Sequence, residues 1–297
     1  MNYRHAFHAG NFADVHKHAV LARILVHLRL KPAAFRVIDT HAGAGRYDLF
    51  SSEATRGGEW HAGIEPVWLA PPQGEARALL APYLDAVAAL NPDGQLRVYP
   101  GSPLIVKHML RPQDRLVACE LEPRSAASLV ATLRGANVTA LAIDGWMALG
   151  AYVPPKERRG LVLIDPPFEE AAEFTRLSGK LAAAHRKWPT GIYMLWYPIK
   201  DRAQTDALAR RLQKLAIPKL LRCEMTLGQP RPDGGLLGSG LLLINPPFTL
   251  EQDLQTLLPE LARLLSPHSA FRLDWLVPDE TVRSVVSHFS TRKNWSN

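Results

Sequence analysis

The chain has 297 residues, and 47% of them are hydrophobic, which is enough for one large domain with a sizeable core. This composition argues against an intrinsically disordered protein. The formal net charge of +7 favours a polyanionic partner, although many soluble enzymes are equally basic.

Neither export nor membrane insertion is expected. No apolar run approaches the roughly 20 residues that a membrane helix needs, and the first residues contain no apolar signal core. Cys119 and Cys223 lie in apolar stretches, where buried, reduced thiols are expected rather than a disulfide or a metal site. We therefore expect a cytoplasmic protein without a membrane partner.

The first long element is predicted to be a helix that begins at Asp14 and is ended by Pro32, because its apolar residues repeat at helical spacing. Asp14 can cap this helix or lie in its first turn. A strand over residues 34–39 follows and leads into a turn, Thr40–Arg46, that contains two glycines.

Residues 47 to about 98 interrupt this pattern. They contain loop-like stretches and one segment of helical periodicity, residues 75–90. We therefore predict a small, mostly helical insertion subdomain after the first strand-to-helix turn. The next helix is expected over residues 101–110, opened by Ser102 with a proline at an early position.

From residue 114 onward, strands and helices alternate, which predicts a mostly parallel, doubly wound sheet with helices on both faces. We predict one main domain over residues 1–280, and the tail over residues 281–297 is expected to be weakly ordered. A hairpin-like loop, residues 228–240, joins two late strands. The predicted strands are 115–120, 138–144, 161–165, 191–198, 219–227, 241–245 and 271–277, and the predicted helices are 124–134, 145–152, 169–187, 203–215 and 250–265.

The most informative stretch is Gly160–Phe168, in which an apolar run precedes Asp165 and two prolines. The run is typical of a buried parallel strand, and the prolines must end it because proline cannot donate a ladder hydrogen bond. The carboxylate of Asp165 and the carbonyl of Pro166 then lie at the strand's carboxyl end, where ligands bind in open α/β sheets. The stretch resembles the catalytic motif of S-adenosylmethionine-dependent methyltransferases that act on exocyclic amino groups of nucleobases.

Three earlier strands also end in carboxylates. Asp39 precedes the turn with Gly43, which lacks the third glycine of the dinucleotide fingerprint but matches the D-x-x-x-G-x-G pattern of methyltransferases. Glu120 can accept ribose hydroxyls, and Asp144, followed by Gly145, can bind an adenine amino group. Either acid alone is better explained as a helix cap, but the ordered series of four strand-end acids points to a nucleoside-containing cofactor.

A second copy of the proline motif, Asn245–Phe248, follows a late strand. By its local pattern it could equally be the catalytic site. Order along the sheet decides, because Asp165 ends the strand expected next to the first one, whereas Asn245 lies further from the cofactor crevice. We interpret the second copy as a structural stop, or at most a contact on the substrate side.

The N-terminal segment, residues 1–30, is predicted to form a clamp beside the cofactor. Lys17 and His18 would face the cofactor's carboxylate, and Tyr3 and Arg4 would face the substrate. A metal site is not expected, because the spacing of the four histidines matches no known ligand set and no Cys or acid cluster joins them. These histidines are His5, His8, His16 and His18.

Taken together, these residues resemble the bacterial 23S rRNA adenine-N6 methyltransferase J family. The resemblance spans nearly the whole chain, and its first stretch is very specific. The family motif ends in Tyr where this chain has Phe168, which keeps the stacking face and loses only the hydroxyl. The matching stretches are Tyr3–His18, Asp39–Tyr47, Tyr99–Ile105, Arg158–Pro167, Gly191–Pro198 and Ile244–Pro247.

This resemblance implies a Rossmann-like class I S-adenosylmethionine-dependent methyltransferase that modifies N6 of an adenine in 23S rRNA, adenine 2030 in the family. It implies that the insertion helps to hold RNA and that the RNA is free or in early assembly; we expect a monomer without a metal. The predicted catalytic residues are Asp165, Pro166 and Phe168; the predicted cofactor contacts are Lys17, His18, His41, Gly43, Ser102, Glu120, Asp144, Gly145 and Asp165; and the predicted RNA contacts are Tyr3, Arg4 and His5.

Other functions share parts of this pattern. A DNA adenine-N6 methyltransferase uses the same catalytic motif, but the insertion of about 50 residues is small for reading a duplex site. A methyltransferase of protein glutamine or of small amines can also use an Asp/Asn-Pro-Pro site. A non-catalytic nucleic-acid-binding module is disfavoured because every chemical position is filled.

Overall fold

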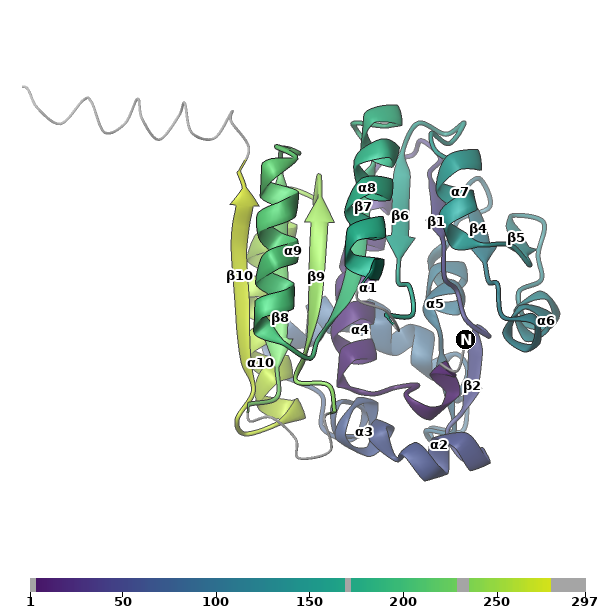
Figure 1. The fold of residues 1–297 in the computed structure, drawn as a ribbon. Helices are drawn as coiled ribbons and strands as arrows, with labels where there is room; N and C mark the ends of the chain where they lie inside the picture. The colour runs from purple at the N-terminus through teal and green to yellow at the C-terminus, as the bar shows by residue number, and fades with distance from the viewer. Residues whose placement is uncertain (1–3, 169–171, 229–234, 279–297) are drawn as a thin grey trace, which may run out of the picture.

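The computed structural model describes residues 4–168, 172–228 and 235–278. An eight-stranded sheet forms its centre, in the order β10-β8-β9-β7-β6-β1-β4-β5 (Figure 1). Strand β1 pairs in parallel with β4 on one side and β6 on the other. The strands are β1 (Arg36–Asp39), β4 (Arg115–Cys119), β5 (Val138–Leu141), β6 (Gly160–Ile164), β7 (Ile192–Ile199), β8 (Leu220–Thr226), β9 (Gly238–Ile244) and β10 (Ala270–Val277).

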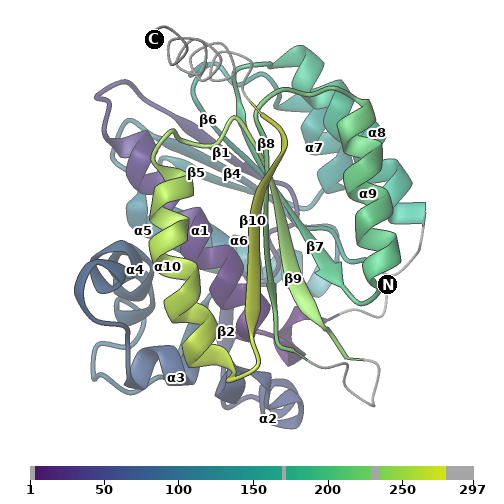
Figure 2. The same ribbon diagram turned by 90° about the vertical axis from the view of Figure 1, so that its left-hand side faces the viewer.

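Helices cover both faces of this sheet, as Figure 2 shows. This arrangement explains the uninterrupted apolar run of β6, all five residues of which are buried. One face carries α1 (Phe12–Arg29), α5 (Ser102–Met109) and α10 (Leu250–Leu265); the other carries α7 (Gly145–Ala151), α8 (Ala172–Lys187) and α9 (Arg202–Lys214), and α6 (Pro123–Thr132) packs beside β5. No helix in the described ranges combines the length and apolarity that a membrane span requires.

The side of the sheet formed by β7, β9, β8 and β10 is antiparallel. Strand β9 runs antiparallel to both of its neighbours, β7 and β8, and β10 pairs antiparallel with β8. The two late strands that a hairpin-like loop was predicted to join are therefore an antiparallel pair, with β9 inserted between β7 and β8, which both precede it in the chain. As a result, the carboxyl end of β9 lies at the opposite edge of the sheet from the carboxyl ends of β6 and β7.

Most predicted elements are confirmed to within a few residues, but some boundaries were wrong. Strand β9 begins at Gly238, inside the predicted loop 228–240. Helix α1 begins two residues before Asp14, because the side chain of Asn11 accepts a hydrogen bond from the Asp14 amide and caps it. Strand β5 ends at Leu141, before Asp144. Helix α5 is capped by Gly101, and Ser102 is its first residue rather than its cap.

The segment between β1 and α5 contains short helices and a strand pair that the sequence did not predict. Strands β2 (Arg46–Asp48) and β3 (Val98–Pro100) form a separate antiparallel pair. Three residues each are too few to show an alternating pattern. The long helix of this segment packs against α1 and α10. The segment holds α2 (Ser52–Gly57), η2 (Glu59–Ala62), α3 (Ile64–Leu69) and α4 (Gly74–Ala88), and η1 (His5–Phe7) precedes α1.

Candidate active site

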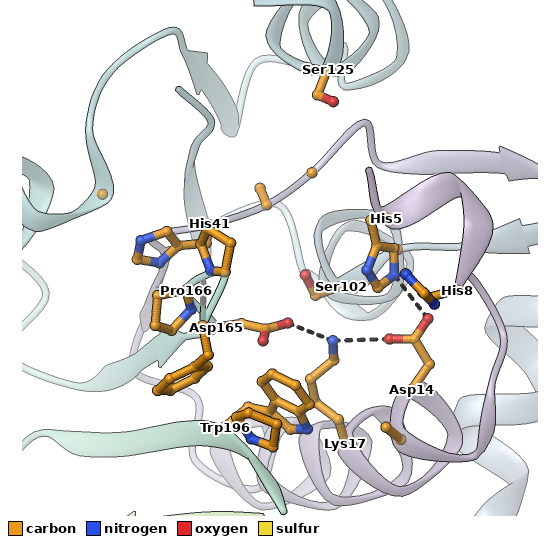
Figure 3. Close-up of a pocket in the computed structure, with 18 of the residues that line it drawn as sticks. His5, His8, Asp14, Lys17, His41, Ser102, Ser125, Asp165, Pro166 and Trp196 are labelled. Atoms are coloured by element: carbon orange, nitrogen blue, oxygen red, sulfur yellow. Dashed lines mark hydrogen bonds and ion pairs between the residues drawn. The ribbon is translucent and has the colours of Figure 1, made fainter. Parts of the chain in front are cut away.

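A pocket of about 880 Å³ lies at the carboxyl ends of β1, β4, β6 and β7, between the sheet and the N-terminal segment. Its wall contains most of the residues that the sequence singled out (Figure 3). Arg4 is not among them: it is exposed and lies 3.9 Å from Glu53. Tyr3 lies outside the described residues. The predicted residues that line the pocket are His5, Lys17, His18, His41, Gly43, Ser102, Glu120, Asp144, Gly145, Asp165, Pro166 and Phe168.

Asp165 directly follows β6, where the two prolines end the strand, and its side chain points into the pocket (Figure 3). The ammonium group of Lys17 lies 2.5 Å from Asp165 Oδ2 and 2.9 Å from Asp14 Oδ1. Burial opposes the charge of Lys17, but the two carboxylates more than offset this cost and raise its pKa. The contact of Lys17 with a cofactor stays a prediction; its observed partners are these carboxylates.

Asp14 is a functional candidate that the sequence reading treated only as a helix-end residue. Its Oδ2 atom accepts hydrogen bonds from the Gly10 amide and from His5 Nε2, both at 2.9 Å. Burial penalises the Asp14 charge, yet His5 and Lys17 hold the pKa of this carboxyl well below its usual range. Asp14 therefore anchors the N-terminal segment and fixes the lysine that reaches Asp165.

His18 is almost completely buried at the pocket wall, and burial lowers its pKa to about 3. Its Nδ1 atom lies 2.7 Å from the hydroxyl of Tyr99, which in turn lies 2.9 Å from the hydroxyl of Tyr83. Within the described part of the chain, Nε2 of His18 has no hydrogen-bond partner. Its position at the pocket wall therefore suits a ligand polar group.

The glycine turn and the next two acids form the opposite wall. Glu120 accepts hydrogen bonds from the amides of Gly43 and Glu122, each at 2.8 Å, so it ties the turn to the end of β4. Asp144 caps α7 through the Trp146 amide at 2.8 Å. Gly145 has no room for a side chain, because an added Cβ would lie 2.0 Å from the Thr40 carbonyl oxygen. Close backbone contact therefore closes the floor of the pocket.

Two titratable groups at the end of β1 have shifted pKa values. Burial raises the pKa of the Asp39 carboxyl to about 7, although the Ser102 hydroxyl donates a hydrogen bond of 2.6 Å to it. Burial lowers the pKa of His41 to about 4, and its ring meets that of Trp146 edge-on. His41 is therefore neutral at physiological pH.

The far end of the pocket is aromatic. The ring of Phe168 packs 4.9 Å from that of Phe174 and 5.8 Å from that of Trp196, measured between ring centroids. Trp196 belongs to β7 and lines the pocket together with Pro198 and Lys200 of the same strand and its end. Trp196 lies in the matching stretch Gly191–Pro198, but no role was predicted for it from the sequence.

The second proline motif lies elsewhere. Ile244, which precedes Asn245, pairs with Tyr193 near the start of β7, so Asn245 lies at the opposite edge of the sheet from Asp165. The Asn245 side-chain amide donates hydrogen bonds to the carbonyls of Pro189 and Gly191, at 2.7 and 2.8 Å. These contacts support the interpretation as a structural stop, and the position excludes a contact on the substrate side of the pocket.

The N-terminal histidines do not converge on one point. His16 lies in the core between Ser239 and Cys223, His5 bonds to Asp14 and His8 to Glu59. Across the described ranges, no group of three or more His, Cys, Asp or Glu residues is arranged to hold a metal ion.

The sheet order, the antiparallel strand β9 and the acids at successive strand ends define a Rossmann-like class I S-adenosylmethionine-dependent methyltransferase. A family model described as Ribosomal RNA large subunit methyltransferase D, RlmJ, matches residues 32–277. The chain therefore belongs to the ribosomal RNA large subunit methyltransferase J family.

Individual relatives agree with this assignment. The chain is 40% identical over 282 residues to Ribosomal RNA large subunit methyltransferase J of Escherichia coli and 38% identical over 283 residues to the protein of the same name from Haemophilus influenzae. Each alignment covers 94% of this chain and 100% of the relative. A crystal structure of a Legionella pneumophila protein matches with a TM-score of 0.83 and 35% identity, covering 90% of this chain and 98% of that one.

Proposed function

We propose that this protein transfers a methyl group from S-adenosylmethionine to N6 of an adenine in 23S rRNA, the family's adenine 2030. The observation that carries the proposal is the position of Asp165 and Pro166 at the end of β6, beside the glycine-turn strand β1 and inside the pocket. Family membership and the basic net charge of +7 support an RNA substrate.

The residues of the pocket wall fit S-adenosylmethionine. Glu120 and Asp144 are acceptors suited to ribose hydroxyls and an adenine amino group. Gly43 and Gly145 line the pocket without a side chain, and Nε2 of His18, which has no hydrogen-bond partner among the described residues, suits the cofactor's carboxylate. His41, Ser102 and Lys17 complete the proposed cofactor contacts. When bound, this cofactor supplies an activated methyl group on its sulfonium ion.

The chain's own part in catalysis is to hold the acceptor base. An adenine amino group is a poor nucleophile because its lone pair is delocalised into the ring. Asp165 and the Pro166 carbonyl would accept hydrogen bonds from its two N–H groups. These bonds would turn the nitrogen lone pair out of conjugation and aim it at the methyl group. The ion pair with Lys17 fixes the orientation of the Asp165 carboxylate. The transfer is then an in-line displacement without a covalent enzyme intermediate.

The proton balance requires no strong base. Methylation leaves a cationic amino group on the adenine, which releases a proton readily to water or to Asp165. Phe168 would stack on the base, which must leave any helical stack to enter the pocket. Tyr3, Arg4 and His5 are proposed to contact the RNA, and the insertion over residues 47–98 to support it. We further propose a cytoplasmic monomer that acts on free or early-assembly RNA, built as one domain over residues 1–280.

A DNA adenine-N6 methyltransferase is the second candidate, because Asp165–Phe168 does not distinguish the two nucleic acids. The two functions separate in a tritiated-methyl assay that offers deproteinised 23S rRNA or duplex DNA with adenine sites. We expect transfer to the rRNA and little to the DNA. Equal or greater transfer to DNA would replace the proposal by the second candidate, and transfer to neither would remove both.

A further inference from the structure

The sheet order divides the pocket into two sides. Five of the proposed cofactor residues, His41, Gly43, Glu120, Asp144 and Gly145, follow β1, β4 and β5, whereas β7 lies beyond β6 on the other side of Asp165. Trp196 belongs to β7 and lines the pocket there. Its ring stands 5.8 Å from Phe168 at an interplanar angle of 61°, and the Lys17 ammonium lies 5.9 Å from its centroid. Trp196 thus borders the proposed catalytic ion pair, as Figure 3 shows, and its ring also contacts that of Phe168.

A buried chain of hydrogen bonds holds this indole. Trp196 Nε1 donates to Ser239 Oγ at 3.0 Å, and Ser239 Oγ lies 3.0 Å from His16 Nδ1. The other ring nitrogen of His16 lies 3.2 Å from Cys223 Sγ. Ser239, His16 and Cys223 are all fully buried, so none of them contacts the pocket contents directly.

One arrangement of protons gives an acceptor to the N–H and O–H donors of Trp196, Ser239 and His16. An indole N–H can only donate, so Ser239 accepts from Trp196 and can donate its own proton to His16 Nδ1. His16 then carries its proton on Nε2 and donates to the sulfur of Cys223. Burial lowers the pKa of His16 to about 3, which keeps the imidazole neutral, so one ring nitrogen donates and the other accepts.

We propose that Trp196 is the acceptor-side wall of the site and contacts the target purine, and that Ser239 and His16 are positioning residues that act through its indole. This inference rests on the proposed function, because it assigns the base that Asp165 would hold to the corner formed by Trp196 and Phe168. Since the two rings are not parallel, a base stacked on one presents its edge to the other. The corner is apolar and excludes water from the reacting amino group.

Helix α1 therefore serves the site with two consecutive residues. Lys17 reaches Asp165, and His16 reaches the indole through Ser239. Because both side chains leave one buried turn of α1, the carboxylate and the aromatic wall are held at a fixed separation. This gives a reason for the complete burial of His16 and Ser239.

The first test compares two tryptophans whose indole N–H groups both bond to a side chain. We expect Trp196→Ala to lower kcat/KM for a 23S rRNA transcript about 10- to 100-fold, because stacking on an aromatic ring contributes on this scale. Binding of S-adenosylhomocysteine, measured by titration calorimetry, should change less than about threefold. The matched control is Trp275→Ala. Trp275 lies on β10 and its indole N–H donates to Glu251, and the substitution should leave kcat/KM within about twofold.

The second test asks whether Ser239 acts through the indole. Ser239→Ala should lower kcat/KM for the transcript about three- to tenfold in the wild-type background. In a Trp196→Phe background, which lacks the indole N–H, the same substitution should have little further effect. Additive losses would mean that Ser239 serves only general packing and would overturn the positioning role.

The outcomes separate this inference from the proposed function. If the wild type methylates adenine N6 in rRNA but Trp196→Ala keeps normal kcat/KM, the acceptor wall is wrong and the function stands. If Trp196→Ala weakens S-adenosylhomocysteine binding as much as it weakens turnover, Trp196 belongs to the cofactor side and the inference is wrong.

Discussion

The chain carries the same local pattern twice, and the two copies have different surroundings. Asp165–Phe168 ends a parallel strand beside β1 and opens into a pocket of about 880 Å³. Asn245–Phe248 ends the antiparallel strand β9 at the other edge of the sheet. Asp165 is ion-paired to Lys17, whereas Asn245 donates hydrogen bonds to two backbone carbonyls. Phe248 is 86% exposed, and its ring meets that of His27 edge-on.

This difference shows that the surroundings of a short motif depend on the strand that carries it. An apolar strand followed by two prolines stops in either copy, because the missing backbone donor acts in the same way. Only the parallel strand places its stop beside the glycine turn and the neighbouring acids. Asn245 instead has a positive φ of 51°, a conformation that Asn tolerates better than most residues, which suits a tight structural turn.

The strongest test of the comparison removes the acid from the first motif and then places an acid in the second. Asp165→Ala should lower methyl transfer at least about 1,000-fold, because it removes an acceptor aimed at the reacting amino group. S-adenosylhomocysteine binding should fall less than about tenfold. Adding Asn245→Asp to this variant should restore nothing, since the second motif has no pocket beside it. A tritiated-methyl assay and calorimetric titration measure both quantities, and recovery of activity in the double variant would contradict the topological account.

The buried charges beside Asp165 give the next largest effect. Lys17→Met should lower the free energy of unfolding by about 3–5 kcal/mol, because it leaves the buried carboxylate of Asp14 and the partly buried carboxylate of Asp165 without their shared cation. Transfer should be lost as well. Chemical denaturation of this variant and of Lys107→Met, a change on α5 outside the pocket wall, gives the comparison. Equal stability of the two variants would mean that the ion-pair cluster contributes nothing.

Asp39, at the end of β1, also predicts a dependence of the free energy of unfolding on pH. The pKa of Asp39 is raised to about 7 by burial, with the Asp165 charge adding to the effect and Ser102 opposing it. A carboxyl with a raised pKa binds its proton more tightly in the folded state, so its contribution is full at acid pH and is lost as the pH rises through about 7.

Between pH 5 and pH 8, the wild type should therefore lose on the order of 2 kcal/mol of stability relative to Asp39→Asn, which cannot ionise. Unfolding curves of both proteins at each pH provide the measurement. Parallel pH profiles would show that Asp39 is ionised throughout this range.

The two phenylalanines give the smallest effect and the closest match. Phe168→Ala should lower kcat/KM for RNA about 10- to 100-fold through the loss of a stacking surface. Phe248→Ala should change it less than about twofold, because that ring lies at the edge away from the pocket. A steady-state methylation assay of both variants decides, and similar losses would argue against the assignment of the second motif.

The sequence predicted the strand that carries Asp165 because its signals are local. The apolar run before Asp165, the prolines and the alternation of strands and helices need no long-range information. The expected adjacency of β1 and β6 followed from the rules of doubly wound sheets and was confirmed. The same local signals were ambiguous for Asn245, and only the antiparallel register of β9 resolves that case.

What the sequence did not predict depends on contacts between distant segments. Asp14 resembles an ordinary helix-end acid until Lys17 and Asp165, 148 residues apart in the chain, are seen to meet beside it. The link from His16 to Trp196 passes through Ser239, 223 residues beyond the histidine. No spacing rule brings such residues together, since their proximity follows from the packing of α1 against the sheet.

The most direct test of the central claim is a mass map of methylated nucleosides in 23S rRNA from cells with and without this gene. We expect the deletion to remove one N6-methyladenine, at the position of the family target, and the wild-type gene to restore it while Asp165→Ala does not. An unchanged map, or restoration by Asp165→Ala, would contradict the account.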